Sequence, residues 1–377
     1  MARNAASFQS RRRMGRRYTV AVFVLFALVG GWILLWKFAA GKVDETLNGW
    51  RAREAQAGRA YACGTQTVGG FPFRIVVGCN DLSAVFHDRA LPFEVKTRGI
   101  QVEAELYRPT ELNGTFTGPL TIADPGQQPV LAADWRHGTV SLQGTPISPK
   151  ELRLSFDGPT LDRVDGARSN LFSAKRLEVT GRLVGGSVTD NPVVELALRL
   201  ERGSLPGLHP AAIPPINADI AVHLRGLHDF RPKPWPQRFR DIQAANGRIE
   251  ITRGRVKQGE TIATGTGALS LTADGYLQGQ VRVTIAGLEP FLKAIGAAQM
   301  VQKSQGMDKF AGFLDRLSPG LGDVARREAG ANLAAGINML GEPTTLEGKH
   351  AVALPLRFEQ GAVFLGPIPI GRTPPLF

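Results

Sequence analysis

Most of the chain consists of segments in which apolar and polar side chains alternate. The clearest examples lie at 193–201, 216–225 and 277–285, and shorter ones lie at 102–106, 152–156, 249–251 and 352–358. Alternation with a period of two places successive side chains on opposite faces of a β-strand. Strands with one apolar and one polar face are typical of antiparallel sheets. We therefore predict a mainly β fold of antiparallel, one-sided sheets.

Short turn motifs separate many of these segments, and they predict tight hairpins. They are Asn113-Gly114, Asp157-Gly158, Asp165-Gly166, Asn246-Gly247 and Asp274-Gly275. The pattern does not decide whether the apolar faces line an open groove or meet in a closed sandwich. The chain shows no strict repeat period, so we do not predict a solenoid.

An uncharged stretch of nineteen residues, YTVAVFVLFALVGGWILLW, occupies residues 18–36. As a helix it is about 28 Å long, which matches a hydrocarbon core of ~30 Å. Tyr18 at one end and Trp32 and Trp36 near the other are side chains that favour the membrane interface. We predict a transmembrane helix followed by a helical stalk over 37–60. A cleaved signal peptide is the alternative, with Ala39-Ala40-Gly41 as its cleavage site.

The net charge of +12 is concentrated at the start of the chain. Residues 1–17 contain six arginines and no acidic residue, and five of them lie directly before the apolar stretch (Arg11, Arg12, Arg13, Arg16 and Arg17). Basic residues stay on the cytoplasmic side of a membrane-spanning helix. We therefore interpret 1–17 as a cytoplasmic tail beside membrane lipid, not as a nucleic-acid site. This places the bulk of the chain in the periplasm, beyond a bacterial inner membrane.

Cys63 and Cys79 are the only cysteines and follow shortly after the predicted stalk. In an oxidising compartment this spacing favours one structural disulfide, worth about 3 kcal/mol on the chain-entropy model. Two buried thiols or a redox pair are the alternatives. Between the cysteines, GGFPFRIVVG at 69–78 predicts a turn and a strand, so the two cysteines would tie a hairpin.

This hairpin carries a resemblance to a known family. Gly70, Phe71, Pro72, Phe73 and Arg74, then Cys79, together with the anchor and a C-terminal Gly366-Pro367 segment, resemble the bacterial domain-of-unknown-function family 2125. The resemblance covers most of the chain after the anchor and implies no activity or catalytic residues. In architecture alone, an anchor with repeated amphipathic strands is also similar to AsmA-like envelope proteins, which are linked to lipid traffic.

Two further segments bear on the domain organisation. FRPKPWPQRF contains three prolines, which predicts an extended connector at 231–239 between a β region at 61–230 and a second one at 240–377. Helical periodicity returns at about 289–341, where we expect a small helical insertion that packs on the sheet or forms a lid. At the C-terminus, GPIPIGRTPPLF predicts a terminal strand or an interaction tail.

The chain contains no sequence motif of a known catalytic, cofactor or metal site. His223 and His228 are too poorly spaced for a helical metal pair, and Glu103 and Glu105 alternate on a polar strand face. We therefore predict no catalytic, cofactor-binding or metal-binding residue and no cofactor. Three hypotheses remain: a module that binds or transfers lipid or another apolar envelope ligand, a non-enzymatic envelope scaffold that binds a protein partner, and a periplasmic hydrolase. The sequence does not indicate the oligomeric state.

Overall fold

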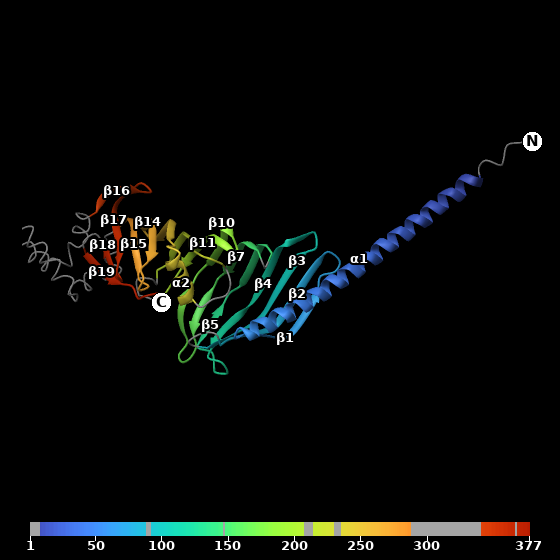
Figure 1. Ribbon diagram of the computed structural model, residues 1–377, viewed down its shortest axis with the longest axis horizontal. Helices are drawn as coiled ribbons and strands as arrows, with labels where there is room; N and C mark the ends of the chain where they lie inside the picture. Colours follow the sequence, from blue (N-terminus) through green and yellow to red (C-terminus); the bar gives the residue numbers. More distant parts are fainter. Residues whose placement is uncertain are drawn as a thin grey trace, which may run out of the picture.

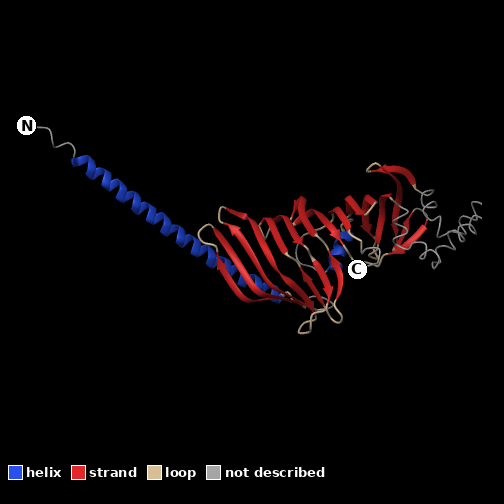
Figure 2. Ribbon diagram, turned by 180° about the vertical axis from the view of Figure 1, so that it is seen from behind, coloured by secondary structure: helices blue, strands red, loops and turns tan. Residues whose placement is uncertain are grey.

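A computed structural model describes residues 8–87, 92–145, 148–206, 214–229, 235–287, 341–365 and 368–377. Figure 1 shows an elongated molecule with a long helix at one end and one layer of strands extending away from it. Figure 2 shows the same layer from behind, with no second sheet stacked on the described strands. The mainly β prediction is confirmed.

The long helix, α1 (Phe8–Gln56), includes the apolar stretch and continues through the predicted stalk without a break. It is long and apolar enough to cross a membrane, and none of its most apolar window is buried against the rest of the protein. The stalk ends earlier than predicted, because β1 begins at Arg59. The ion pair between Arg59 and Glu54, at 2.6 Å, joins the end of the helix to the start of this strand.

The described strands form a single antiparallel sheet. They are β1 (Arg59–Gly69), β2 (Arg74–Phe86), β3 (Phe93–Glu105), β4 (Arg108–Ala123), β5 (Leu131–Asp134), β6 (His137–Gly144), β7 (Pro149–Asp157), β8 (Thr160–Arg163), β9 (Ser169–Ser173), β10 (Arg176–Ser187), β11 (Asp190–Gly203), β12 (Ile216–Leu224), β13 (Ile249–Gln258), β14 (Thr261–Leu271), β15 (Leu277–Ala286), β16 (Glu342–Leu346), β17 (Lys349–Glu359), β18 (Ala362–Leu365) and β19 (Ile368–Arg372).

The main path of pairing runs β1-β2-β3-β4-β6-β7-β10-β11-β12-β13-β14-β15-β17-β18-β19. Strand β5 pairs with the end of β4 and leads to β8 and β9, and β16 pairs with β17. Within the described residues, β1 pairs only with β2 and β19 only with β18. The described strands therefore form one open sheet and not two sheets packed face to face (Figure 2).

Three of the predicted hairpin turns are wrong. Asp157-Gly158 lies between β7, which pairs with β6 and β10, and β8, which pairs with β5 and β9, so it does not close a hairpin. Asn246-Gly247 lies between a helix, α2 (Trp235–Ala244), and β13.

The third of these predicted turns, Asn113-Gly114, lies in the middle of β4 and not at a hairpin. A Cβ added at Gly114 would lie 2.8 Å from Cγ1 of Val140 on the neighbouring strand. Close packing across the sheet, not turn geometry, therefore explains this glycine.

The predicted extended connector at 231–239 is also wrong in its second half. Residues 235–239 form the start of α2 (Trp235–Ala244), and residues 231–234 lie outside the described part of the chain. A proline at the second helical position, Pro236, is tolerated because first-turn amides have no partner within the helix. Strands β12 and β13 on either side of this segment pair directly, so the sheet is continuous across it.

Helix α2 packs on one face of the sheet and forms the main buried cluster. Ile242, 2% exposed, meets Leu227, Val194 and Leu271 there. Phe239 of α2 and the C-terminal Leu376 and Phe377 pack around this cluster. At the C-terminus, the antiparallel pairing of β19 with β18 confirms the predicted terminal strand. The structure does not describe residues 288–340, so the helices predicted at about 289–341 lie outside the described part of the chain, apart from residue 341.

Candidate functional site

The most extensive feature of the described sheet is one continuous apolar face. Its middle row runs across twelve paired strands, and every residue in it is aliphatic or glycine. The row is Ile75, Ala104, Leu112, Leu142, Leu152, Gly181, Leu196, Val222, Ile251, Gly267, Val281 and Leu356. At about 4.8 Å between strands, this row is roughly 50 Å long.

Two further apolar rows lie on one side of it, two and four residues along each strand, and a shorter row from Leu183 on β10 to Phe358 on β17 lies on its other side. The first of the two is Val68, Val77, Val102, Gly114, Val140, Leu154, Val179, Leu198 and Ile220. The second is Cys79, Ile100, Phe116, Gly138, Phe156, Leu177, Leu200, Ala218, Val256, Ala263, Ile285 and Val352. We call the middle row and these two rows together the apolar face.

Little of the described protein covers the apolar face in its middle. Apart from contacts between strands, the substantial contacts between described elements are those of α1 with β1 and of α2 with β14. Leu152 and Leu196, which flank Gly181 in the middle row, are 41% and 42% exposed. A soluble sheet normally buries such a row against a second layer. The middle of this face is therefore a long apolar surface without a covering layer among the described elements.

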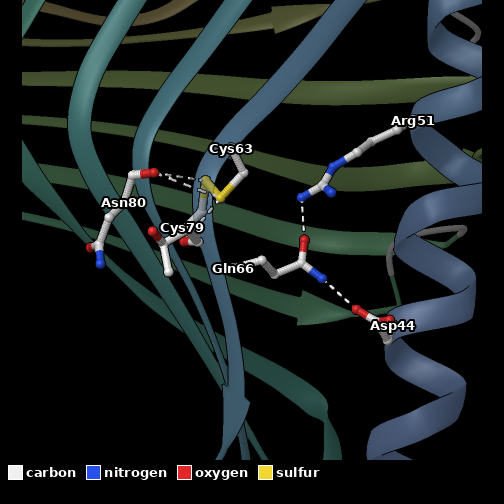
Figure 3. The surroundings of a disulfide bond; sticks show 7 residues. Asp44, Arg51, Cys63, Gln66, Cys79 and Asn80 are labelled. Atoms are coloured by element: carbon white, nitrogen blue, oxygen red, sulfur yellow. Dashed lines mark hydrogen bonds between the residues drawn. A yellow bond between two sulfur atoms is a disulfide. The ribbon is translucent and has the colours of Figure 1, made fainter.

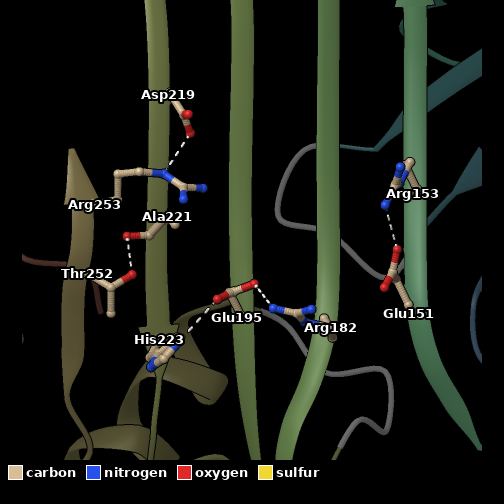
Figure 4. Close-up of polar contacts among 9 residues, drawn as sticks. All are labelled: Glu151, Arg153, Arg182, Glu195, Asp219, Ala221, His223, Thr252 and Arg253. Atoms are coloured by element: carbon tan, nitrogen blue, oxygen red, sulfur yellow. Dashed lines mark hydrogen bonds and ion pairs between the residues drawn. The ribbon is translucent and has the colours of Figure 1, made fainter. Parts of the chain in front are cut away.

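The opposite face of the same strands is polar and held by ion pairs between neighbouring strands (Figure 4). Arg182 on β10 and His223 on β12 both bond Glu195 on β11, at 2.7 and 3.2 Å. Further along, Arg253 on β13 meets Asp219 on β12 at 2.9 Å. The contacts of Glu195 join three strands, and the Arg253–Asp219 pair joins two, so both reinforce the sheet from its polar side.

The electrostatics of this polar face are those of a structural network. Partial burial opposes ionisation of Glu195, but the hydrogen bond from His223 and the charge of Arg182 together lower the pKa of this carboxyl below its ordinary value. A carboxylate stabilised by two partners is a poor general base. No group of three or more metal-ligating side chains occurs among the described residues.

The predicted disulfide between Cys63 and Cys79 is present, with a Cα–Cα distance of 5.7 Å. It joins β1 to β2, which also pair along their length, so the predicted hairpin is confirmed. Figure 3 shows how α1 lies beside this hairpin: the side chain of Gln66 on β1 accepts from Arg51 and donates to Asp44 of the helix. The disulfide is therefore next to the junction of helix and sheet.

The Gly70–Arg74 turn of this hairpin is held against the apolar helix. Trp32 donates its indole hydrogen to the carbonyl of Pro72, and Trp36 donates to that of Arg74, both at 2.8 Å. The rings of Trp32 and Phe73 are 6.1 Å apart, and those of Trp36 and Phe71 are 5.5 Å apart. The motif and the two tryptophans were separate features of the sequence, and the fold brings them together.

One residue of the motif, Gly70, has a backbone reason. Gly70 has φ of +100°, and a Cβ there would lie 2.8 Å from the carbonyl oxygen of Arg74. That oxygen accepts from Trp36, so a glycine at 70 leaves room for the contact with the helix.

Of the residues predicted to set the membrane topology, Arg11 to Arg17 belong to α1 by their backbone, and Tyr18 is 70% exposed.

A family model described as "Uncharacterized protein conserved in bacteria (DUF2125)" matches residues 36–374. No curated protein matches the chain.

Proposed function

The chain belongs to this family of uncharacterised bacterial proteins, and from that premise we propose that it is a membrane-anchored protein whose apolar face binds acyl chains of lipid. The observation that carries the proposal is the unbroken middle row from Ile75 on β2 to Leu356 on β17. The ligand is a membrane lipid or another apolar molecule of the cell envelope.

We place the anchor in the inner membrane, with the N-terminus in the cytoplasm and the sheet in the periplasm. The arginines before the apolar stretch support this orientation because basic flanks remain cytoplasmic. The disulfide supports it independently, because such bonds persist in oxidising compartments such as the bacterial periplasm.

The size and chemistry of the apolar face suit acyl chains. Three rows spaced by two residues make it about 13 Å wide, and its length of roughly 50 Å exceeds the bilayer's hydrocarbon core of ~30 Å. Fully burying a leucine contributes about 1.5–3 kcal/mol. Leu152 and Leu196 are 41% and 42% exposed, so covering each of them contributes roughly 1 kcal/mol, and an acyl chain lying along the row gains this without any polar contact. The three described rows contain no charged or hydroxyl side chain that could recognise one headgroup, which favours a ligand defined by its apolar part.

A matched pair of substitutions tests this use of the face. Gly181 has no positive φ, and its nearest added-Cβ contact is 3.6 Å, so Gly181→Glu fits and places a carboxylate in the middle row. Thr180→Glu adds the same charge one residue away on the polar face, opposite Arg153. The full chain is reconstituted in liposomes containing phosphatidylethanolamine with a photoreactive acyl chain, and cross-linked peptides are identified by mass spectrometry.

We expect cross-links in α1 and also in β7, β10 and β11 of the unchanged protein. Gly181→Glu should reduce the strand cross-links at least fivefold and leave those of α1 unchanged, whereas Thr180→Glu should leave both sets. Cross-links confined to α1 in the unchanged protein would overturn the proposal and favour the scaffold hypothesis. An equal loss in both variants would show that added charge disturbs the sheet, and would contradict a role specific to one face.

A further inference from the structure

Three large aromatic side chains are exposed on two neighbouring turns next to α1. Phe71 and Phe73 lie in the turn between β1 and β2 and are 51% and 59% exposed. Tyr107 lies in the turn between β3 and β4 and is 67% exposed. Clustered exposed aromatic side chains of this kind mark a surface that meets another phase or partner. We call these three residues the aromatic platform.

The two turns form one unit. The amide of Leu106 donates to the carbonyl of Phe73 at 3.0 Å, and Arg74 pairs with Glu105 at the ends of β2 and β3. Tyr107 therefore follows directly from the strand end that is bonded to the first turn. The indoles of Trp32 and Trp36 fix this unit to α1 through the carbonyls on either side of Phe73.

The contact with α1 sets the depth of the platform relative to a bilayer. The uncharged stretch ends at Trp36, and Lys37 follows it. Trp32 and Trp36 therefore lie in the last turn or so of the span, at about the level where the hydrocarbon meets the headgroups. Atoms that accept hydrogen bonds from these indoles at 2.8 Å lie at the same level.

The residues of the platform suit that level. Phenylalanine and tyrosine rings bury apolar area, and the tyrosine hydroxyl remains in the polar layer. Arg74 and Arg108 lie next to the platform in the chain; their side chains are 57% and 62% exposed and pair loosely with Glu103 at 3.4 Å and Glu111 at 3.6 Å. Exposed guanidinium groups beside the rings are within reach of lipid phosphates.

The geometry points to a second attachment to the membrane: we propose that the aromatic platform inserts into the interfacial layer of the bilayer that α1 spans. The partner is the phospholipid surface itself. This inference rests on the anchoring part of the proposed function and does not require that the apolar face binds lipid. Its consequence is that the β2 and β3 end of the middle row, at Ile75 and Ala104, lies one or two residues from the turns and therefore close to the bilayer surface.

Single labels on the two ends of one strand test the inference. The full chain carries Tyr107→Cys, labelled with the fluorophore NBD, in liposomes of phosphatidylethanolamine and phosphatidylglycerol. The matched control is Gln127→Cys in the exposed turn beyond the other end of β4, a strand of 16 residues that is about 50 Å long. Intact mass of each protein verifies one label and a retained Cys63–Cys79 bond.

Lipid carrying a doxyl group near the headgroup should quench the label at 107 at least threefold more than the label at 127. Iodide in the buffer should quench the two labels in the opposite order. Phe71→Ser combined with Phe73→Ser should weaken the lipid quenching at 107 by at least half and leave the label at 127 unchanged.

Extraction of the same liposomes with alkaline carbonate separates the possible failures. If the protein stays in the bilayer while labels 107 and 127 respond alike, the platform inference is overturned and the anchor stands. If carbonate removes the protein, the anchoring itself is wrong, and the platform inference is overturned with it.

Discussion

The contact of Trp32 and Trp36 with the hairpin turn gives the most direct quantitative prediction. Changing both to Phe keeps an aromatic ring opposite Phe73 and Phe71 but removes the two indole donors. Each bond, at 2.8 Å to a backbone carbonyl, contributes about 1 kcal/mol net. The double change should therefore lower the free energy of detaching the turn from the helix by about 2 kcal/mol, which corresponds to roughly a 30-fold larger detached population.

Hydrogen exchange of the full chain in liposomes measures this population. The amides of Arg74 and Leu106, bonded within the joined turns, are the reporters, and they should exchange roughly 30-fold faster. Trp50→Phe is the control, because Trp50 stacks on Tyr61 at 4.8 Å, away from the turn. If the double change leaves the two reporter amides within twofold of the unchanged protein, the indole bonds do not hold the turn.

Three further predictions concern the sheet. Replacing Cys63 and Cys79 with Ser removes a bridge with a sequence separation of 16 and should cost about 3 kcal/mol, seen as faster proteolysis of the β1–β2 hairpin; unchanged proteolysis would contradict it. The pKa of the Glu195 carboxyl is lowered in the folded protein, so its contribution to stability is present above the ordinary value of 4.5 and is lost as pH falls through the folded pKa. Glu195→Gln should therefore unfold at a lower temperature than the unchanged protein at neutral pH, and the difference should disappear as pH falls below 4.5 and through the folded pKa; a constant difference would refute the assignment. Ile242→Ala, at a site 2% exposed, should lower the unfolding free energy by about 2–4 kcal/mol in a denaturant titration, and a loss below about 1 kcal/mol would mean that α2 is not packed as described.

Two features of the sequence were sufficient to predict their structures. Alternation within 193–201, 216–225 and 277–285 predicted strands that the structure contains as parts of β11, β12 and β15. The two cysteines predicted the disulfide because no third cysteine competes. Both succeed because the signal is local, either a period of two or a single possible pairing.

Turn and connector residues were less informative, because the same residue type serves different purposes. Glycine at 114 matched a hairpin turn in sequence, but it lies where Val140 of the next strand leaves no room for a Cβ. Prolines predicted an extended connector at 231–239, yet Pro236 falls in the first turn of α2, where a proline costs little. Only the neighbours in space distinguish these cases.

Hydrophobic periodicity along the chain was enough to predict a helix able to cross a membrane and many strands with one apolar side, because it is a property of each segment alone. The tertiary structure decided that these apolar sides align in one open sheet, since register between strands depends on pairings such as Leu152 with Gly181 and Gly181 with Leu196. It also decided that the Gly70–Arg74 turn meets Trp32 and Trp36, residues nearly forty positions away in the chain. Contacts over such separations depend on how α1 lies along β1, which no local pattern encodes.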